Sequence, residues 1–210
     1  MSDYTEITTA LMAGDADGLI ANVNKAIEAG SPAGEILNEG LIATMDVVGG
    51  KMETGEMFIP EVLMCAQAMT MAVDILKPLL SEGDTATAGT IVIGTVKGDL
   101  HDIGKNLVTM MLESAGFAVV DLGVDVDPEE FLNAVKEHNA DVLALSALLT
   151  TTMPMLKQTI DVFESNGMRD KVKILIGGAP VDQAFADEIG ADGYAADAGS
   201  ASKLAKSILS

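Results

Sequence analysis

The periodicity of the sequence changes near residue 84, and this change constrains the fold more than any other feature. Before it, apolar residues recur at spacings of three and four, which predicts helices over 5–13, 17–29, 33–52 and 61–80. After it, short apolar runs alternate with amphipathic stretches, as strands followed by helices do. We therefore expect a four-helix bundle at 1–83, a linker at 84–88 and a doubly wound parallel-sheet domain at 89–210.

The second part reads as strands and helices in regular alternation. Five short runs are predicted to be strands: 90–95, 118–122, 142–146, 173–176 and 193–195. Helices are expected at 103–114, 128–138, 153–165, 181–189 and 200–209. The first run is apolar almost without a break, which is typical of a strand covered on both faces. This pattern indicates a Rossmann-like or flavodoxin-like α/β fold, in which ligands bind at the carboxyl ends of the strands.

The acidity of the chain limits its partners. Its 210 residues carry a formal net charge of −20, whereas nucleic acids and anionic membranes attract basic surfaces, so we expect neither as a partner. We find no apolar run that suggests a membrane span and no signal-peptide pattern, and we therefore expect a cytoplasmic protein. Cys65 is the only cysteine, which excludes an internal disulfide.

The loop after the first predicted strand carries the strongest chemical signal. It runs from Gly98 to Gly104 with the sequence GDLHDIG, and it contains His101, one of two histidines. Asp99, two positions earlier, can accept one imidazole N–H and leave the other ring nitrogen free for a metal ion. Taken alone, a single histidine is more simply explained as a solvated side chain.

Two further predicted strands end at the same edge of the sheet. The 142–146 strand leads into three threonines at 150–152, and the 173–176 strand is followed by Gly177 and Gly178. Hydroxyl groups and paired glycines suit a large, partly polar ligand, because glycine lets a ligand approach the backbone. Separately, the threonines are also explained by a helix cap and the glycines by a turn.

The stretch from Gly94 to Asn106 resembles the cobalt-ligating loop of corrinoid (cobalamin-binding) proteins, and the resemblance extends from residue 5 to residue 209. These proteins carry a methyl group on cobalt in methyltransferase systems, and the cobalamin module of methionine synthase is a relative. The resemblance implies cobalamin bound base-off/His-on, with His101 replacing the cofactor's own lower ligand. It also implies that Asp99 and Thr152 complete a hydrogen-bonded triad with His101.

The resemblance implies further cofactor contacts around this triad. They are Gly98, Asp102, Ile103 and Gly104 in the loop, and Ser146, Leu148, Thr150, Gly177, Gly178 and Tyr194 at the other strand ends. In the helical part, Met52 and Ile59 align with two apolar residues that cover the upper face of cobalt. Met52 stands where the methionine synthase module has phenylalanine, and periodicity alone would explain both residues as core.

The implied function is that of a corrinoid-carrying subunit and not of an enzyme acting by itself. Such a carrier shuttles a methyl group between a substrate-specific methyltransferase and a second methyltransferase that uses tetrahydrofolate or coenzyme M. A reductive activase is a further implied partner, and the segment 81–88 is expected to act as a hinge. Two alternatives stay open, namely a cobalamin-dependent sensory module and a flavodoxin-like domain for another cofactor.

Overall fold

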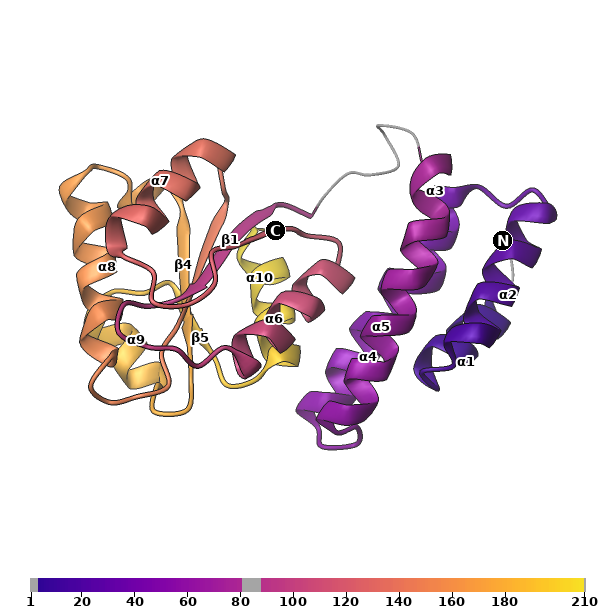
Figure 1. Cartoon of the computed structure of the whole chain (residues 1–210), viewed down its shortest axis with the longest axis horizontal. Coiled ribbons are helices and arrows are strands. Elements are labelled where there is room, and N and C mark those ends of the chain that lie inside the picture. The colour runs from indigo at the N-terminus through magenta and orange to yellow at the C-terminus, as the bar shows by residue number, and fades with distance from the viewer. Residues whose placement is uncertain (1–3, 81–87, 210) are drawn as a thin grey trace. The chain divides into compact units, whose positions relative to one another are not determined.

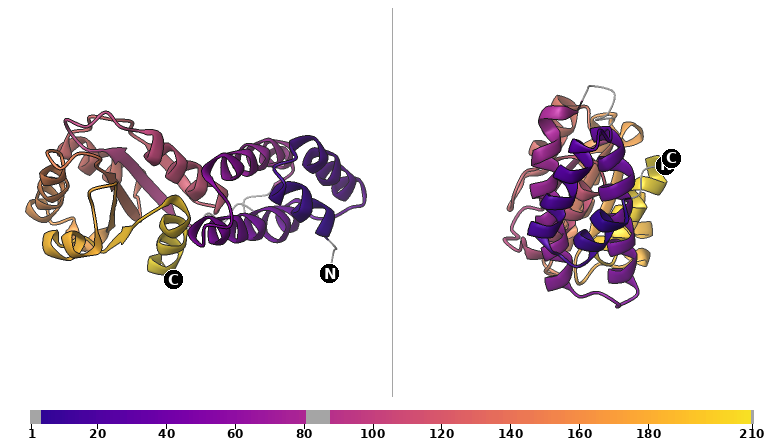
Figure 2. Two further views of the ribbon diagram at one scale, coloured as in Figure 1. Left: turned by 90° about the horizontal axis from the view of Figure 1, so that it is seen from below. Right: turned by 90° about the vertical axis from the view of Figure 1, so that its right-hand side faces the viewer.

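A computed structural model describes residues 4–80 and 88–209. The chain forms two compact units, one built from helices and one built around a sheet (Figures 1 and 2). The hinge expected at 81–88 and the linker at 84–88 lie outside the described residues, apart from residue 88. The domain boundary itself therefore stays a prediction.

The helical unit contains four consecutive helical segments. They are α1 (Thr5–Met12), α2 (Ala16–Glu28), a composite of α3 (Ala33–Glu35), η1 (Ile36–Ile42) and α4 (Ala43–Glu53), and α5 (Ile59–Leu76), which η2 (Lys77–Leu79) follows. Both α1 and α5 pack against α2 and α4, so that the helices lie side by side (Figure 2). The predicted four-helix architecture is confirmed.

The third segment contains a local change of helix type that the periodicity did not predict. Ile36–Ile42 is π-helical, although the sequence predicted one ordinary helix over 33–52. A π-helix joins residues five apart by hydrogen bonds, which turns them toward the same side. Ile36 and Leu41 are five apart and both fully buried, so the wider turn places two large side chains in one core.

Helix α5 contributes much of the apolar core of the helical unit. Its buried residues are Val62, Cys65, Ala66, Ala68, Met69, Ala72 and Leu76. By length and composition alone, Ile59–Leu79 could cross a membrane, but apolar core helices of soluble proteins share this length and composition. We interpret α5 as a core helix, and Cys65 as a free, buried thiol.

The second unit is a five-stranded sheet with all neighbouring strands parallel. Its strands are β1 (Thr90–Thr95), β2 (Ala118–Asp121), β3 (Val142–Ser146), β4 (Lys173–Gly177) and β5 (Gly193–Ala195). They are arranged in the order β2-β1-β3-β4-β5. This is the flavodoxin-like order, and it confirms the predicted doubly wound sheet.

Helices cover both faces of this sheet. They are α6 (Ile103–Ser114), α7 (Pro128–His138), α8 (Met153–Ser165), α9 (Gln183–Ile189) and α10 (Ala198–Leu209), with the short η3 (Arg169–Lys171) before β4. Helices α7, α8 and α9 lie on one face and α6 and α10 on the other (Figure 1). Phe131, Leu156 and Phe163 are fully buried beneath the first group. This double cover explains why β1 is apolar almost throughout.

The strand order places a topological switch point between β1 and β3. After β1 the chain passes through α6 to β2, whereas after β3 it passes through α8 to β4 on the other side. The two loops therefore diverge at the carboxyl edge of the sheet, where α/β proteins of this kind bind ligands. Both loops contain residues that the sequence predicted for the site.

Candidate functional site

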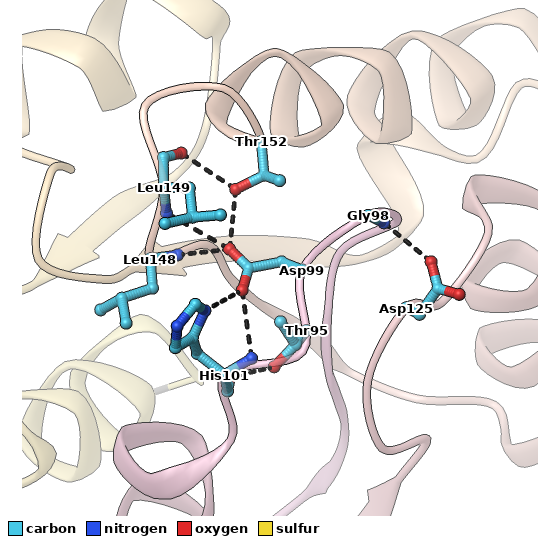
Figure 3. Close-up of polar contacts among 8 residues, drawn as sticks. All are labelled: Thr95, Gly98, Asp99, His101, Asp125, Leu148, Leu149 and Thr152. Atoms are coloured by element: carbon cyan, nitrogen blue, oxygen red, sulfur yellow. Dashed lines mark hydrogen bonds and ion pairs between the residues drawn. The ribbon is translucent and has the colours of Figure 1, made fainter.

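A buried carboxylate, that of Asp99, joins the β1–α6 loop to the β3–α8 loop (Figure 3). Its Oδ1 accepts hydrogen bonds from Nδ1 of His101 at 2.7 Å and from the His101 backbone N–H at 3.1 Å. Its Oδ2 accepts from Thr152 Oγ1 at 2.7 Å and from the backbone N–H groups of Leu148 at 2.7 Å and Leu149 at 3.3 Å. The predicted triad of Asp99, His101 and Thr152 is thus brought together.

These donors keep the buried carboxylate charged. Burial raises the pKa of Asp99, but hydrogen bonds from Thr152, His101 and the Leu148 backbone outweigh it and hold the pKa well below its usual value. An ionised carboxylate can only accept hydrogen bonds, so Nδ1 of His101 carries the proton of that contact. Thr152 has one hydroxyl proton, and the charged Asp99 oxygen is a nearer acceptor than the Leu149 carbonyl at 2.9 Å.

The remaining ring nitrogen of His101 is left with its lone pair for a metal ion. The side chain is 50% exposed, and its backbone carbonyl accepts a hydrogen bond from Thr95 Oγ1 at 3.0 Å. Within 4–80 and 88–209, no group of three or more His, Cys, Asp or Glu residues could hold a metal. A metal at His101 must therefore bring most of its other ligands with it.

Exposed apolar side chains lie on the two loops that the Asp99 carboxylate joins. In the β1–α6 connection Leu100 is 71% exposed and Ile103 86%, while Leu148 and Leu149 in the β3–α8 loop are each 40% exposed. Exposed apolar residues gathered at one place often mark a binding surface. Together with a single available imidazole nitrogen, they fit a metal held in a large macrocycle, as the resemblance to corrinoid proteins implies.

The neighbouring strand ends are packed closely because of one glycine. Gly178 has a φ of +131°, and a Cβ there would lie 1.8 Å from the carbonyl oxygen of Ala147. Ser146 pairs in register with Thr95 on β1 and with Gly177 on β4, which places it centrally at the same edge. Gly178 therefore has a structural role in bringing the ends of β3 and β4 together.

Other predicted residues lie around this centre. Asp102 precedes α6, where its carboxylate accepts from Asn106 Nδ2 at 3.2 Å. Gly104 has nothing within 4 Å of an added Cβ, and Thr150 is exposed in the β3–α8 loop. Tyr194 lies further along the edge, where it pairs with Ile176. Cofactor contact by these residues stays a prediction.

The predicted cap residues belong to the helical unit. Met52 is half-buried near the end of α4, and Ile59 is 51% exposed at the first position of α5. The exposure of Ile59 contradicts its alternative explanation as a core residue. Its neighbour Phe58, which the sequence reasoning missed, is 67% exposed, and its backbone N–H donates to Glu61 Oε2 at 2.8 Å.

Matches to known families cover both units. A B12 binding domain model matches residues 89–202, and a second B12 binding domain model matches residues 4–77. The chain belongs to the family of B12-binding corrinoid proteins. A corrinoid is therefore its cofactor, as the family resemblance implied.

Individual relatives connect this corrinoid protein with methyltransferase systems. It is 47% identical to a dimethylamine corrinoid protein of Methanosarcina acetivorans, over 97% of this chain and 94% of the relative. It resembles a crystal structure of a cobalamin-binding protein from Desulfitobacterium hafniense, with a TM-score of 0.84 and 32% identity over 98% of both chains. It also resembles the methanol:cobalamin methyltransferase complex of Methanosarcina barkeri, with a TM-score of 0.86 and 36% identity over 98% of this chain and 79% of that one.

Proposed function

We propose that this corrinoid protein is a methyl carrier that holds cobalamin base-off/His-on through His101. The observation that carries the proposal is the half-exposed imidazole, which the buried Asp99 carboxylate orients among exposed apolar side chains. When bound, the cobalt supplies the atom on which a methyl group is carried. Asp99 keeps the proton on Nδ1 and so leaves the opposite nitrogen to bind the metal, while Thr152 and the Leu148 backbone hold Asp99 in place.

The surrounding residues receive roles that follow from their positions. Ser146, Thr150, Gly177 and Tyr194 lie along one edge of the sheet and would contact the displaced nucleotide tail. Open space beside Gly104 leaves room for that tail, and Gly178 keeps the strand ends together. Gly98, Asp102 and Ile103 would contact the corrin from the loop.

We assign the helical unit the role of a cap that shields the upper face of the cofactor. Met52 and Ile59 would supply its apolar contacts, and the exposed Phe58 beside Ile59 extends that surface. A cap of this kind needs apolar surface more than directional contacts, and Met52, Phe58 and Ile59 provide that surface.

The proposed partners are two methyltransferases and a reductive activase in the cytoplasm. Relatives named for dimethylamine are 47% identical, whereas the chain from the methanol complex is 36% identical, so a methylated amine is the first donor to test. Tetrahydrofolate and coenzyme M are the acceptors to compare. In this scheme the chain carries the cofactor, and the partners bind and activate the substrates.

Cofactor loading tests the binding mode. We would load the protein with hydroxocobalamin, remove free cofactor, and compare visible spectra and cobalt content with those of His101→Ala. His138→Ala is the matched control, because His138 is exposed at the C-terminal end of α7, away from the carboxyl ends of the strands. We expect one cobalt per chain and a histidine-ligated spectrum that only His101→Ala loses. An identical spectrum in His101→Ala would overturn the assigned ligand.

Methyl transfer tests the carrier role separately. The reduced, loaded protein would be mixed with a dimethylamine methyltransferase and dimethylamine, and in parallel with a methanol methyltransferase and methanol. We expect the methylcobalamin spectrum to appear with the amine pair. Stable cobalamin binding without methylation by either pair would leave the cofactor assignment intact and contradict the choice of donor.

A further inference from the structure

The connection between β2 and α7 contains a strained residue, Asp125. Its φ is +57°, a left-handed conformation that costs about 1–2 kcal/mol in an ordinary L-residue and less in aspartate. Among residues 4–80 and 88–209, Asn139 is the one other non-glycine residue with a positive φ, and it ends helix α7. No helix ends at Asp125, so its conformation needs another explanation.

Asp125 holds the backbone of the β1–α6 loop from two directions (Figure 3). Its Oδ1 accepts a hydrogen bond from the backbone N–H of Gly98 at 2.8 Å. Its own backbone N–H donates to the carbonyl oxygen of Asp99 at 3.0 Å. The side chain of Asp125 thus binds Gly98 and its backbone binds Asp99. The left-handed conformation of Asp125 occurs together with these two hydrogen bonds.

The same connection also runs beside the end of β1. The Thr95 backbone N–H donates to the carbonyl of Gly123 at 2.9 Å, and the Val126 N–H donates to the carbonyl of Thr95 at 3.1 Å. Thr95 in turn donates through Oγ1 to the carbonyl of His101. The β2–α7 connection therefore makes hydrogen bonds both to Thr95, at the end of β1, and to the loop that follows it.

We propose that Asp125 is a positioning residue for His101, acting through Gly98 and Asp99. The inference rests on the proposed function, because it concerns how well His101 is held for ligation. Gly98 has a φ of +82° and precedes Asp99 directly, so rotation of this segment would displace the carboxylate that orients the imidazole. The ion pairs of Lys97 with Asp127 at 3.1 Å and with Asp125 at 3.7 Å are exposed and contribute little.

Three variants separate the possible causes. Asp125→Asn keeps an acceptor oxygen and tolerates a left-handed φ, whereas Asp125→Gly keeps only the conformational freedom. Asp127→Asn is the matched control, because it removes a carboxylate of the same connection whose partner is Lys97, and it leaves the contacts of Asp125 with Gly98 and Asp99 in place. Thermal unfolding of each variant checks that the fold is retained.

The first measurement follows the histidine-ligated spectrum of the hydroxocobalamin-loaded proteins on acidification. Protons compete with the metal for the imidazole, so weaker ligation is lost at a higher pH. We expect Asp125→Gly to weaken ligation about threefold to tenfold, which raises the midpoint by about 0.5 to 1 pH unit. Asp125→Asn and Asp127→Asn should match the unaltered protein. A wild-type midpoint in Asp125→Gly, or equal shifts in all three variants, would overturn the proposal.

The second measurement needs no cofactor and keeps the inference separate from the proposed function. The Nδ1 proton of His101, held by the buried Asp99, should give a downfield and slowly exchanging NMR signal. We expect its exchange to become at least threefold faster in Asp125→Gly and to stay unchanged in Asp125→Asn. If the unaltered protein gives this signal but no histidine-ligated spectrum, the ligation model fails. If exchange in Asp125→Gly is unchanged, the positioning role fails.

Discussion

The surroundings of His101 and the start of α5 both present apolar side chains to solvent, but they are held in different ways. At His101, a buried charge accepts hydrogen bonds from the loops that follow two different strands. At Phe58 and Ile59, the contact from Glu61 fixes the backbone of the helix start. The ligating nitrogen of His101 must point in one direction, which its hydrogen bonds to a buried charge ensure. The apolar surface at Phe58 and Ile59 must only exclude water, which needs no such fixed direction.

The largest expected effect comes from removing the buried charge. Asp99→Ala leaves the donors of Thr152, Leu148 and His101 without their acceptor, and should lower the free energy of unfolding by about 3–5 kcal/mol. Urea denaturation followed by circular dichroism measures this. Ile59→Ala in the helical unit is the control, with a change below about 0.5 kcal/mol because this side chain is 51% exposed. Equal losses in both variants would remove the contrast between the regions.

A smaller loss of stability is expected from substituting Gly178, and Gly104 provides the comparison. Gly178→Ala places a Cβ against the Ala147 carbonyl, and should destabilise the fold by about 2–3 kcal/mol in thermal unfolding. Gly104→Ala meets no neighbour within 4 Å and should change stability by less than about 0.5 kcal/mol, while lowering cobalamin affinity. Unchanged affinity in Gly104→Ala would show that the space beside it is not used by the cofactor.

The depressed pKa of Asp99 predicts a pH dependence of stability. A lowered folded-state pKa stabilises the protein above the unfolded value near pH 4, and this contribution is lost as the pH falls toward the folded value. Below about pH 4, the unfolding free energy should therefore fall with decreasing pH, and this group should contribute up to about 1.4 kcal/mol per pH unit to that slope. Urea titrations at a series of acidic pH values should show a shallower slope in Asp99→Asn. An unchanged slope would contradict the contribution assigned to Asp99 and attribute the acid sensitivity to other carboxylates.

The smallest change in stability is expected in the proposed cap. Ile59→Ser alters a side chain that is 51% exposed, so unfolding free energy should change by less than about 0.5 kcal/mol. The loaded variant should nevertheless exchange its upper ligand for cyanide several-fold faster, as stopped-flow absorbance can measure. Thr70→Ser, at an exposed position further along α5, is the control. Equal exchange rates would contradict the shielding role.

The sequence predicted the parallel strands well because their apolar runs are short, continuous and bounded by turns. The loop from Gly98 to Gly104 also placed Asp99 and His101 correctly, since both lie on one short segment. Thr152 was found through the family resemblance, because no local pattern connects it with a residue 53 positions away. Distant partners of a site are visible in sequence only where a known family supplies the alignment.

The features that sequence reasoning missed are those that depend on backbone geometry. The donors from Leu148 and Leu149 are backbone N–H groups, which every non-proline residue has. The left-handed conformation of Asp125 leaves no mark in the periodicity, although a short Gly-Val-Asp stretch before a helix is a weak turn signal. The π-helical turn at Ile36–Ile42 was not predicted either, because a prediction from periodicity assumes the α-helical period.

The span of the Asp99 network also has a consequence for the timing of assembly. Asp99 meets Leu148 and Thr152 across 49 and 53 residues, so we expect these bonds to form together with the pairing of β1 and β3. Contacts between distant residues form late because closing a long loop costs entropy before any contact compensates it. Until residue 152 has been synthesised, the Asp99 carboxylate lacks its donors from the β3–α8 loop. We therefore expect firm cofactor binding only after the central strands of the sheet have paired.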